Sequence, residues 1–309
     1  MSRELVFIHG RAQQGRDPAK LKQEWVDDLA KGLAQNGLPP IDADRVRFPF
    51  YGDALDQMAH GKSPDEVAEV ILKGDGPDDD AAKRFLLSVF DQVRAKYQIS
   101  DDEVEEAADA HFTEKGPLNW PWVRAVLQKL DTRPELSAAT IALATFDVFE
   151  YLTKDPIRRK IDDGVKKAMT DGAESVVVGH SLGSVVAYTV LRRFGGPQFE
   201  GGPAKWKVPL FVTVGSPLAV NAIQKLAPAV IGAGANRTPE CASAWFNAMD
   251  PRDVVSLFPL DAEHFRINPE NPAIENKTDV DNPTQNRHGI SGYLGDPVVA
   301  KRIHEAMQG

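Results

Sequence analysis

The stretch "ESVVVGHSLGSVVAY", residues 174–188, constrains the fold more than any other part of the chain. Three successive valines are typical of a buried strand, and a second apolar run begins directly after a serine flanked by glycines. Gly179 and Gly183 let the strand and the following segment come close together, which leaves Ser181 in a tight, strained turn with a projecting hydroxyl. The pattern predicts a strand, a turn and a helix, and makes Ser181 a candidate nucleophile.

Further apolar runs predict the remaining strands of a sheet. They lie at residues 5–8, 46–50, 208–214 and 244–249, and residues 175–178 form the strand before Ser181. Helical patterns occupy residues 18–35, 157–169, 184–194 and the segment from 297 onward, while 267–287 is a long loop rich in Asn and Pro. Strands that alternate with helices indicate an α/β fold with a mostly parallel sheet, whose sites lie at the carboxyl ends of the strands.

About one hundred residues of helical pattern interrupt this alternation, from 54 to 153. Capping boxes that begin at Ser63 and Ser100 mark two of the expected helix starts. Two interpretations of the aromatic residues in this segment stay open: they form the inner face of a lid over a substrate, or they are the segment's own core. These residues are Phe112, Trp120, Trp122, Phe146, Phe149 and Tyr151.

The composition excludes several classes of protein. Of 309 residues, 42% are apolar and 26% are charged, as in ordinary globular proteins. The formal net charge of −9 is unfavourable for contact with a phosphate backbone, so we expect no nucleic-acid partner. The first apolar run is too short for a signal peptide, and no run approaches the roughly 18 residues that a membrane span needs. We therefore expect no stable membrane insertion and a cytoplasmic location.

The sequence gives no indication of a metal or an organic cofactor. The acidic runs at residues 74–80 and 101–106 lack the ligand spacing of a calcium loop and are typical of solvated helix ends. The single Cys241 has no second cysteine with which to form a disulfide, and lacks the partners of a metal cluster. We expect neither a metal nor a cofactor; the oligomeric state stays open.

A serine nucleophile needs an acid that orients its base, and two aspartates compete for this role. Both follow the predicted strand 244–249, in "DPRDVVSLFP". Asp250 precedes Pro251, which suits the first two positions of a type I turn and gives Asp250 a structural task. Asp253, held by Val254 and Val255, is the preferred acid, with Asp250 as the alternative.

Three histidines downstream of the acids are candidates for the base: His264, His288 and His304. His304 lies within the last predicted helix, and His264 follows the acids closely, in a strand or early loop. His288 comes at the end of the long loop, in "NRHGISGYL", where glycine neighbours and a loop suit a base delivered to a site. We prefer His288.

An oxyanion hole requires backbone N–H groups that point at the developing negative charge. One is expected from Leu182, directly after the nucleophile. The other is expected from the loop after the first strand, "FIHGRAQQG", where Gly10 permits a turn and Arg11 provides the N–H.

Together these segments resemble the α/β-hydrolase family, and specifically its lipase and carboxylesterase-like members. The resemblance rests on "LVFIHG", "VVVGHSLGSVVAY", "VTVGSPLA", "DVVSLFP" and "HGISGYL", and covers residues 1–52 and 156–309. It implies a catalytic core at 1–53 and 154–309 with a helical lid or cap at 54–153, and a reduced sheet of about six strands with flanking helices. "DVVSLFP" is similar to the family's Asp-x-Val segment, a second reason to prefer Asp253.

The resemblance also implies roles for individual residues. Ser181, Asp253 and His288 correspond to the catalytic triad, Arg11 and Leu182 to the oxyanion hole, and Gly179, His180 and Gly183 to the turn that carries the nucleophile. We therefore expect a serine hydrolase, a carboxylesterase that acts on small-molecule esters with small to medium acyl chains. A lipase, thioesterase or amidase would share this machinery, and a non-catalytic ligand-binding protein is the alternative from another class. The insertion precedes the nucleophile strand, which is an unusual place for a cap in this family. Analogy with the caps of other members therefore does not identify the substrate.

Overall fold

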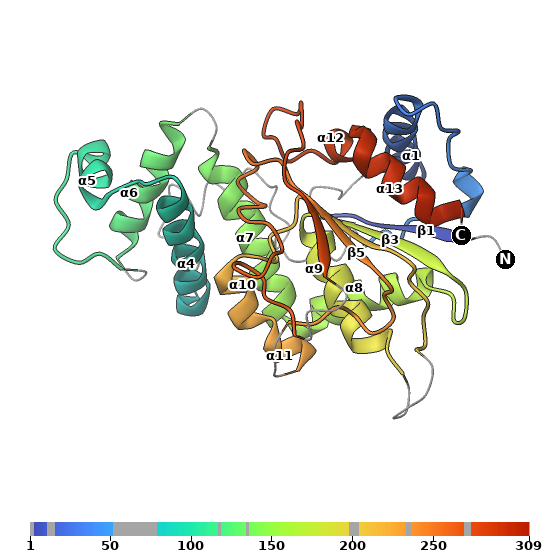
Figure 1. Ribbon diagram of the computed structural model, residues 1–309. Helices are drawn as coiled ribbons and strands as arrows, with labels where there is room; N and C mark the ends of the chain where they lie inside the picture. The colour runs from blue at the N-terminus through green and yellow to red at the C-terminus, as the bar shows by residue number, and fades with distance from the viewer. Residues whose placement is uncertain are drawn as a thin grey trace.

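The computed structural model describes residues 3–10, 16–51, 79–116, 119–133, 136–197, 204–232, 236–268 and 273–308 (Figure 1). The described residues form an α/β fold around a six-stranded sheet in the order β2-β1-β3-β4-β5-β6, in which every neighbouring pair is parallel. The strands are β1 (Glu4–Ile8), β2 (Val46–Arg47), β3 (Ser175–His180), β4 (Phe211–Val214), β5 (Trp245–Ala248) and β6 (Ile274–Lys277). The predicted α/β class and the parallel sheet are confirmed.

Three strands differ from the sequence prediction. β4 begins at Phe211 and not at residue 208. β2 ends at Arg47, because Pro49 has no N–H with which to continue the ladder. The prediction of one long loop from 267 to 287 is wrong, because β6 lies within it and pairs with β5. The sequence of β6, "IENK", has a single apolar residue and lies at the edge of the sheet, so it lacks the apolar pattern that reveals a strand.

One face of the sheet packs against the two ends of the chain. Leu5 and Phe7 of β1 point to this face, together with Val176 and Val178 of β3. It is covered by α1 (Pro18–Ala34), α12 (Ile290–Gly295) and α13 (Pro297–Gln308). The helix α1 begins where the sequence predicts, since Asp17 accepts hydrogen bonds from the N–H groups of Ala19 and Lys20. A short 3₁₀ turn, η1 (Ala43–Arg45), leads into β2.

The other face carries the helix that follows the candidate nucleophile. Val6, Ile8, Val177 and Phe211 point to this face, because successive side chains of a strand alternate. It is covered by α8 (Asp155–Ala168) and α9 (Leu182–Phe194), with α10 (Asn221–Leu226) and α11 (Pro228–Ile231) beside them.

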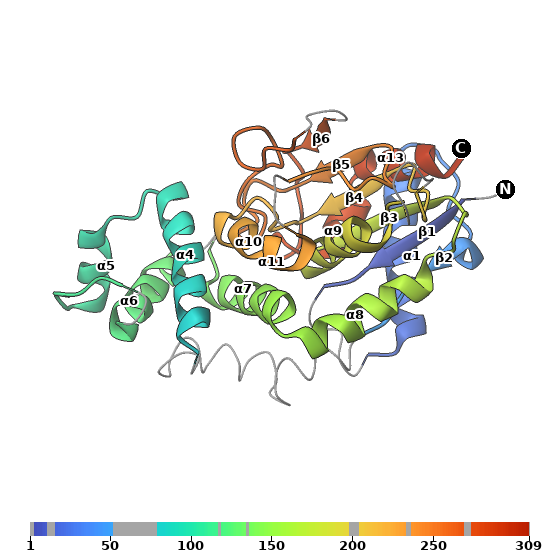
Figure 2. The ribbon, with the colours of Figure 1, turned by 90° about the horizontal axis from the view of Figure 1, so that it is seen from below.

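The insertion extends from this second face, away from the chain termini (Figure 2). Its described helices are α4 (Asp80–Lys96), α5 (Asp101–Ala108), α6 (Trp120–Asp131) and α7 (Ala138–Thr153). The capping box at Ser100 and Glu103 is confirmed, whereas Ser63 lies outside the described residues. The helix α7 connects the insertion to α8 and α9, and the side chains of both parts belong to one continuous apolar core.

The aromatic residues of the insertion pack inside it. Trp120, Trp122, Phe149 and Tyr151 are buried, and Phe112 and Phe146 are partly buried against the same core. The described positions therefore favour the interpretation that these rings are core residues, in a core that the insertion shares with the rest of the fold.

Lys96 links the insertion to the loop that carries the candidate acids. Its ammonium donates hydrogen bonds to the carbonyl oxygens of Leu257 (2.6 Å) and Pro251 (3.4 Å), and lies over the Phe258 ring. Burial lowers the pKa of Lys96, and the nearby charge of Asp253 opposes that effect.

Within the described part of the chain, no helix combines the length and hydropathy needed to cross a membrane.

Candidate active site

Ser181 occupies the sharp turn between β3 and α9, at the carboxyl end of the sheet. Its backbone has φ +55° and ψ −130°, a strained conformation for a residue with a side chain. Both flanking glycines are needed for close packing: a Cβ on Gly179 would lie 2.7 Å from the carbonyl oxygen of Gly183, and one on Gly183 would lie 2.1 Å from that of Ile8. The turn predicted from the sequence therefore exists, and the strain holds the serine hydroxyl away from its own helix.

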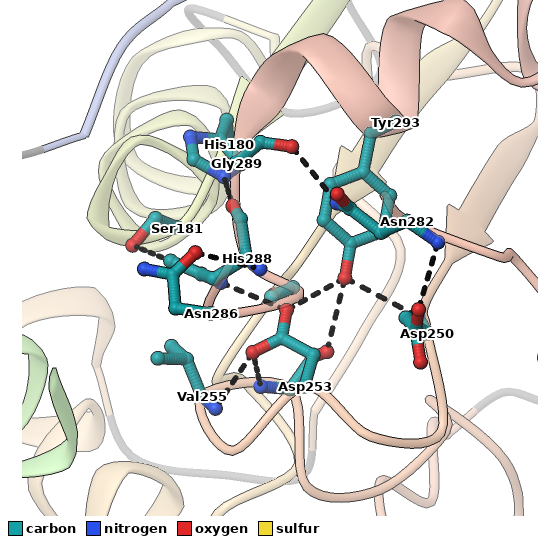
Figure 3. A network of polar contacts seen from close by, with 12 residues as sticks. His180, Ser181, Asp250, Asp253, Val255, Asn282, Asn286, His288, Gly289 and Tyr293 are labelled. Carbon is teal, nitrogen blue, oxygen red and sulfur yellow. Dashed lines mark hydrogen bonds and ion pairs between the residues drawn. The ribbon is translucent and has the colours of Figure 1, made fainter. Parts of the chain in front are cut away.

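The structure brings Ser181, His288 and Asp253 into one hydrogen-bonded chain (Figure 3). The Nε2 atom of His288 lies 2.8 Å from the Ser181 Oγ, and its Nδ1 atom lies 2.8 Å from the Asp253 Oδ2. With Nδ1 protonated, the imidazole donates to the carboxylate and its Nε2 accepts from the serine hydroxyl. This is the arrangement that a serine nucleophile, a base and an orienting acid require.

Asp253 lies at the base of this site with no exposed surface. Its Oδ1 accepts the backbone N–H of Val255 (2.8 Å), while its Oδ2 accepts from His288 and from the hydroxyl of Tyr293 (2.6 Å). Burial alone raises the pKa of this carboxyl, but the charge of His288 and these hydrogen bonds outweigh burial and lower the pKa below its usual value. Asp253 therefore remains a carboxylate at neutral pH although it is buried.

The carboxylate of Asp250, the alternative acid, binds residues other than His288. Its carboxylate accepts hydrogen bonds from the Arg252 side chain (2.7 and 2.9 Å), from the Arg252 backbone (2.8 Å) and from the N–H of Asn282 (2.8 Å). Its carbonyl oxygen accepts the N–H of Asp253, which closes the turn expected at Pro251. Asp250 thus shapes the loop that presents Asp253, and its carboxylate binds Arg252 and Asn282 instead of His288.

Asn282 holds the segment that delivers His288, and the sequence analysis did not single it out. The buried Asn282 amide donates to the Gly289 carbonyl (2.8 Å) and accepts from the N–H (3.1 Å) and hydroxyl (2.6 Å) of Thr284. The Thr284 hydroxyl in turn accepts the N–H of Gly289 (2.9 Å). The only signal in the sequence was the density of Asn and Thr before His288, which is typical of side chains that stabilise loops.

The other two candidate bases lie elsewhere. His264 stacks on Phe258 and pairs with Asp261 through Nδ1 at 2.9 Å. His304 lies on α13, where its Nε2 is 3.1 Å from the side-chain nitrogen of Gln308. Of the three histidines considered, the structure places only His288 beside Ser181.

Two further histidines border the site and remain neutral. His180, directly before the nucleophile, donates from Nε2 to the carbonyl oxygen of His288 (2.7 Å), and burial lowers its pKa to about 3. His9, at the end of β1, stacks on Tyr51 and its Nδ1 lies 2.8 Å from the carbonyl oxygen of Gly10; burial lowers its pKa to about 4. Both rings position backbone atoms around the site without adding positive charge at neutral pH.

Of the two predicted donors of the oxyanion hole, one lies within the described residues. Leu182 is the first residue of α9, where the N–H groups have no acceptor within the helix and the helix dipole favours negative charge. Gly10 packs against the serine, since a Cβ there would lie 2.9 Å from the Ser181 Cβ. Arg11, the second predicted donor, lies outside the described residues.

A cavity of about 360 Å³ opens beside the serine hydroxyl. Core residues on one side include Ser181, Leu182, Asn286, His288 and Ile290. The insertion supplies the opposite side through Thr140, Leu143, Ala144 and Asp147 of α7. Among the described residues of the insertion, those that line the cavity belong to this helix, and one of them is the buried Asp147.

No protein-family model, curated protein or solved structure matches the chain. Among the described residues, no group of three or more His, Cys, Asp and Glu side chains is arranged to hold a metal ion. The interpretation of the site therefore depends on its geometry, and the catalytic roles of its residues stay predictions.

Proposed function

We propose that this protein is a serine hydrolase of the α/β-hydrolase type that cleaves carboxylic esters. The observation that carries the proposal is the Ser181–His288–Asp253 chain, with both hydrogen bonds at 2.8 Å, on a strained turn that faces a cavity. A serine with only a structural role would not require this combination of base, acid, strained turn and cavity. The all-parallel sheet is compatible with that family.

The geometry supports a two-step reaction. His288 Nε2 takes the proton of the Ser181 hydroxyl as Oγ attacks the ester carbonyl, and the carbonyl oxygen becomes an anion near the Leu182 N–H. The protonated imidazole, stabilised by Asp253, then gives its proton to the departing alkoxide, which leaves an acyl group on Ser181. A water molecule, deprotonated by His288, attacks this acyl group and releases the acid; the proton returns to the Ser181 Oγ.

The cavity supports a small to medium ester as substrate. Its volume of about 360 Å³ lies near the lower end of the range for small-molecule sites, roughly 300–1,000 Å³. Leu143 and Ala144 give its insertion side apolar contacts for an acyl chain, and Thr140 and Asp147 add polar groups beside them. We propose that residues 54–153 act as a cap that shapes the substrate site. Lipases, thioesterases and amidases use the same machinery and are the alternatives within this class.

Labelling with a fluorophosphonate probe tests the proposal, because the probe reacts with an activated serine. The wild-type protein should take up one equivalent, and Ser181→Ala should take up none. Ser175→Ala is a matched control, since Ser175 is a buried serine at the start of β3, the strand that leads to Ser181, and does not line the cavity. A folded wild-type protein that takes up no label would refute the proposal and favour a non-catalytic ligand-binding protein.

Turnover of p-nitrophenyl esters from acetate to palmitate then distinguishes the substrate classes. We expect kcat/KM to peak at short or medium chains, because the described cavity is small. A maximum at palmitate would instead identify a lipase.

A further inference from the structure

Tyr293 binds the same carboxylate oxygen that binds the candidate base. It lies on α12, five residues after His288, and its side chain is fully buried. Its hydroxyl donates to the Asp253 Oδ2 at 2.6 Å, and His288 Nδ1 lies 2.8 Å from that oxygen (Figure 3). The second carboxylate oxygen, Oδ1, is occupied by the backbone N–H of Val255. One oxygen of Asp253 is therefore shared by a base and a phenol.

The surrounding structure fixes the direction in which Tyr293 donates. Its hydroxyl oxygen accepts the N–H of Asp250 at 3.2 Å, and the Ser256 hydroxyl lies 3.5 Å away. The charged Asp253 Oδ2, at 2.6 Å, is the nearer and stronger acceptor, so the phenol proton points to Asp253. Gly215, at the end of β4, has φ +57°, and a Cβ there would lie 3.0 Å from the Tyr293 ring and 3.2 Å from the His288 ring. The phenol and the imidazole thus pack side by side against the sheet, with no room for a side chain at Gly215.

Two donors on one carboxylate oxygen compete for its negative charge. A hydrogen bond to a charged acceptor is strong, and neighbouring bonds in a buried network polarise one another. The charge that Tyr293 withdraws from Oδ2 is no longer available to the imidazolium that forms on His288. We propose that Tyr293 is a positioning residue that limits how strongly Asp253 stabilises protonated His288, and thereby sets the lowest pH at which Ser181 reacts.

The other titratable groups near the site do not limit how strongly Asp253 stabilises protonated His288. His180 remains neutral down to about pH 3, because burial lowers its pKa to about that value. Asp250 is engaged with Arg252 and Asn282, and Lys96 binds backbone carbonyl oxygens of the acid loop. Asp147 lines the cavity from α7. Among these groups and Tyr293, only Tyr293 donates to the oxygen that binds His288.

The inference rests on the proposed function, and the pH dependence of fluorophosphonate labelling tests it. Labelling should slow at low pH as His288 becomes protonated, which gives the wild-type protein a midpoint. In Tyr293→Phe, Oδ2 should return its charge to the imidazolium, so the midpoint should rise by at least about 0.5 pH unit. The maximal rate should fall about tenfold or more, as is usual when an outer hydrogen-bond partner of a site is removed.

A matched control separates this effect from the loss of any buried hydrogen bond. Tyr151 is also fully buried, and its hydroxyl donates to the carboxylate of Asp162 at 2.8 Å, outside the site. Tyr151→Phe removes the same kind of bond, so it should lower thermal stability to a similar extent and leave the labelling midpoint unchanged. If Tyr293 only supported the fold, the two variants would behave alike.

A fluorinated tyrosine at position 293 provides a second variant that retains the ring and the hydroxyl. Its more acidic phenol donates more strongly, so the midpoint should fall below that of the wild type. A midpoint that is unchanged or lower in Tyr293→Phe, or unchanged with fluorotyrosine, would overturn the inference while the wild-type protein still labels. Absence of labelling in the wild type would instead overturn the proposed function.

Discussion

Substitution of each aspartate in "DPRD" by asparagine should separate the acid from its structural neighbour. Asp253→Asn places an amide against His288 Nδ1, and the amide NH₂ at the Oδ2 position favours the imidazole tautomer whose proton is on Nε2. That proton points at Ser181, so the base can no longer accept from the serine. The wrong tautomer should reduce kcat about 10⁴-fold, equivalent to about 5.4 kcal/mol at 1.36 kcal/mol per decade.

Asp250→Asn should affect stability far more than catalysis. The amide cannot accept all the hydrogen bonds that the carboxylate takes from Arg252 and Asn282. The Arg252 side chain is 41% exposed, so solvent weakens its ion pair with Asp250, and the buried N–H of Asn282 accounts for much of the effect. We expect a loss of about 1–3 kcal/mol in the free energy of unfolding and less than a tenfold loss of kcat.

The effects on kcat and on the free energy of unfolding are measured independently. Turnover of p-nitrophenyl acetate gives kcat, and urea denaturation gives the free energy of unfolding of each variant. If Asp250→Asn loses several orders of magnitude in kcat while Asp253→Asn retains most of its activity, the assignment of the acid is wrong. If both variants retain activity, the site does not operate as a triad.

Three further predictions follow from individual contacts. Gly183→Ala, whose Cβ would lie 2.1 Å from the Ile8 carbonyl oxygen, should lower the unfolding free energy in urea by about 3 kcal/mol or more; Gly116→Ala, which meets open space, should not. His9, whose pKa is lowered to about 4 from 6.5, is neutral in the folded protein when the unfolded chain takes up a proton. The contribution of His9 to stability should therefore be complete above about pH 6.5 and fall by about 3 kcal/mol towards pH 4, and denaturation of His9→Gln should show a smaller slope with pH. Leu143→Trp should fill part of the cavity and lower kcat/KM for octanoate about tenfold more than for acetate; equal effects on both esters would contradict a role in chain length.

The sequence predicted those parts of the site that depend on local chemistry. The valines before Ser181 and the glycines around it define a strand, a turn and a helix without long-range information, and the structure contains all three. The turn at Asp250 and Pro251 also follows from its own residues, and it was the reason to prefer Asp253 as the acid. His288 was preferred because it stands at a loop end with glycine neighbours, and the structure places it beside Ser181.

The parts of the fold and the site that the sequence did not predict depend on contacts between distant segments. Tyr293 is one apolar residue among several in "HGISGYL", and its role becomes visible only when α12 packs against the loop after β5. The edge strand β6 forms because β5 offers it a ladder, not because "IENK" has a strong strand pattern. The polar lining of the cavity from α7 was also hidden, because helical spacing alone cannot tell which side of a helix faces a cavity.

The order of the catalytic groups along the chain has a consequence during synthesis. Ser181 precedes its base by 107 residues, and Asp253 and Tyr293 also come after the strained turn is complete. A ribosome-bound chain that ends before His288 contains the serine but has no group to take its proton. On the proposed mechanism, reactivity begins only after the segment that carries His288 has been made and has folded against Ser181, so chains released before it would be inert towards esters.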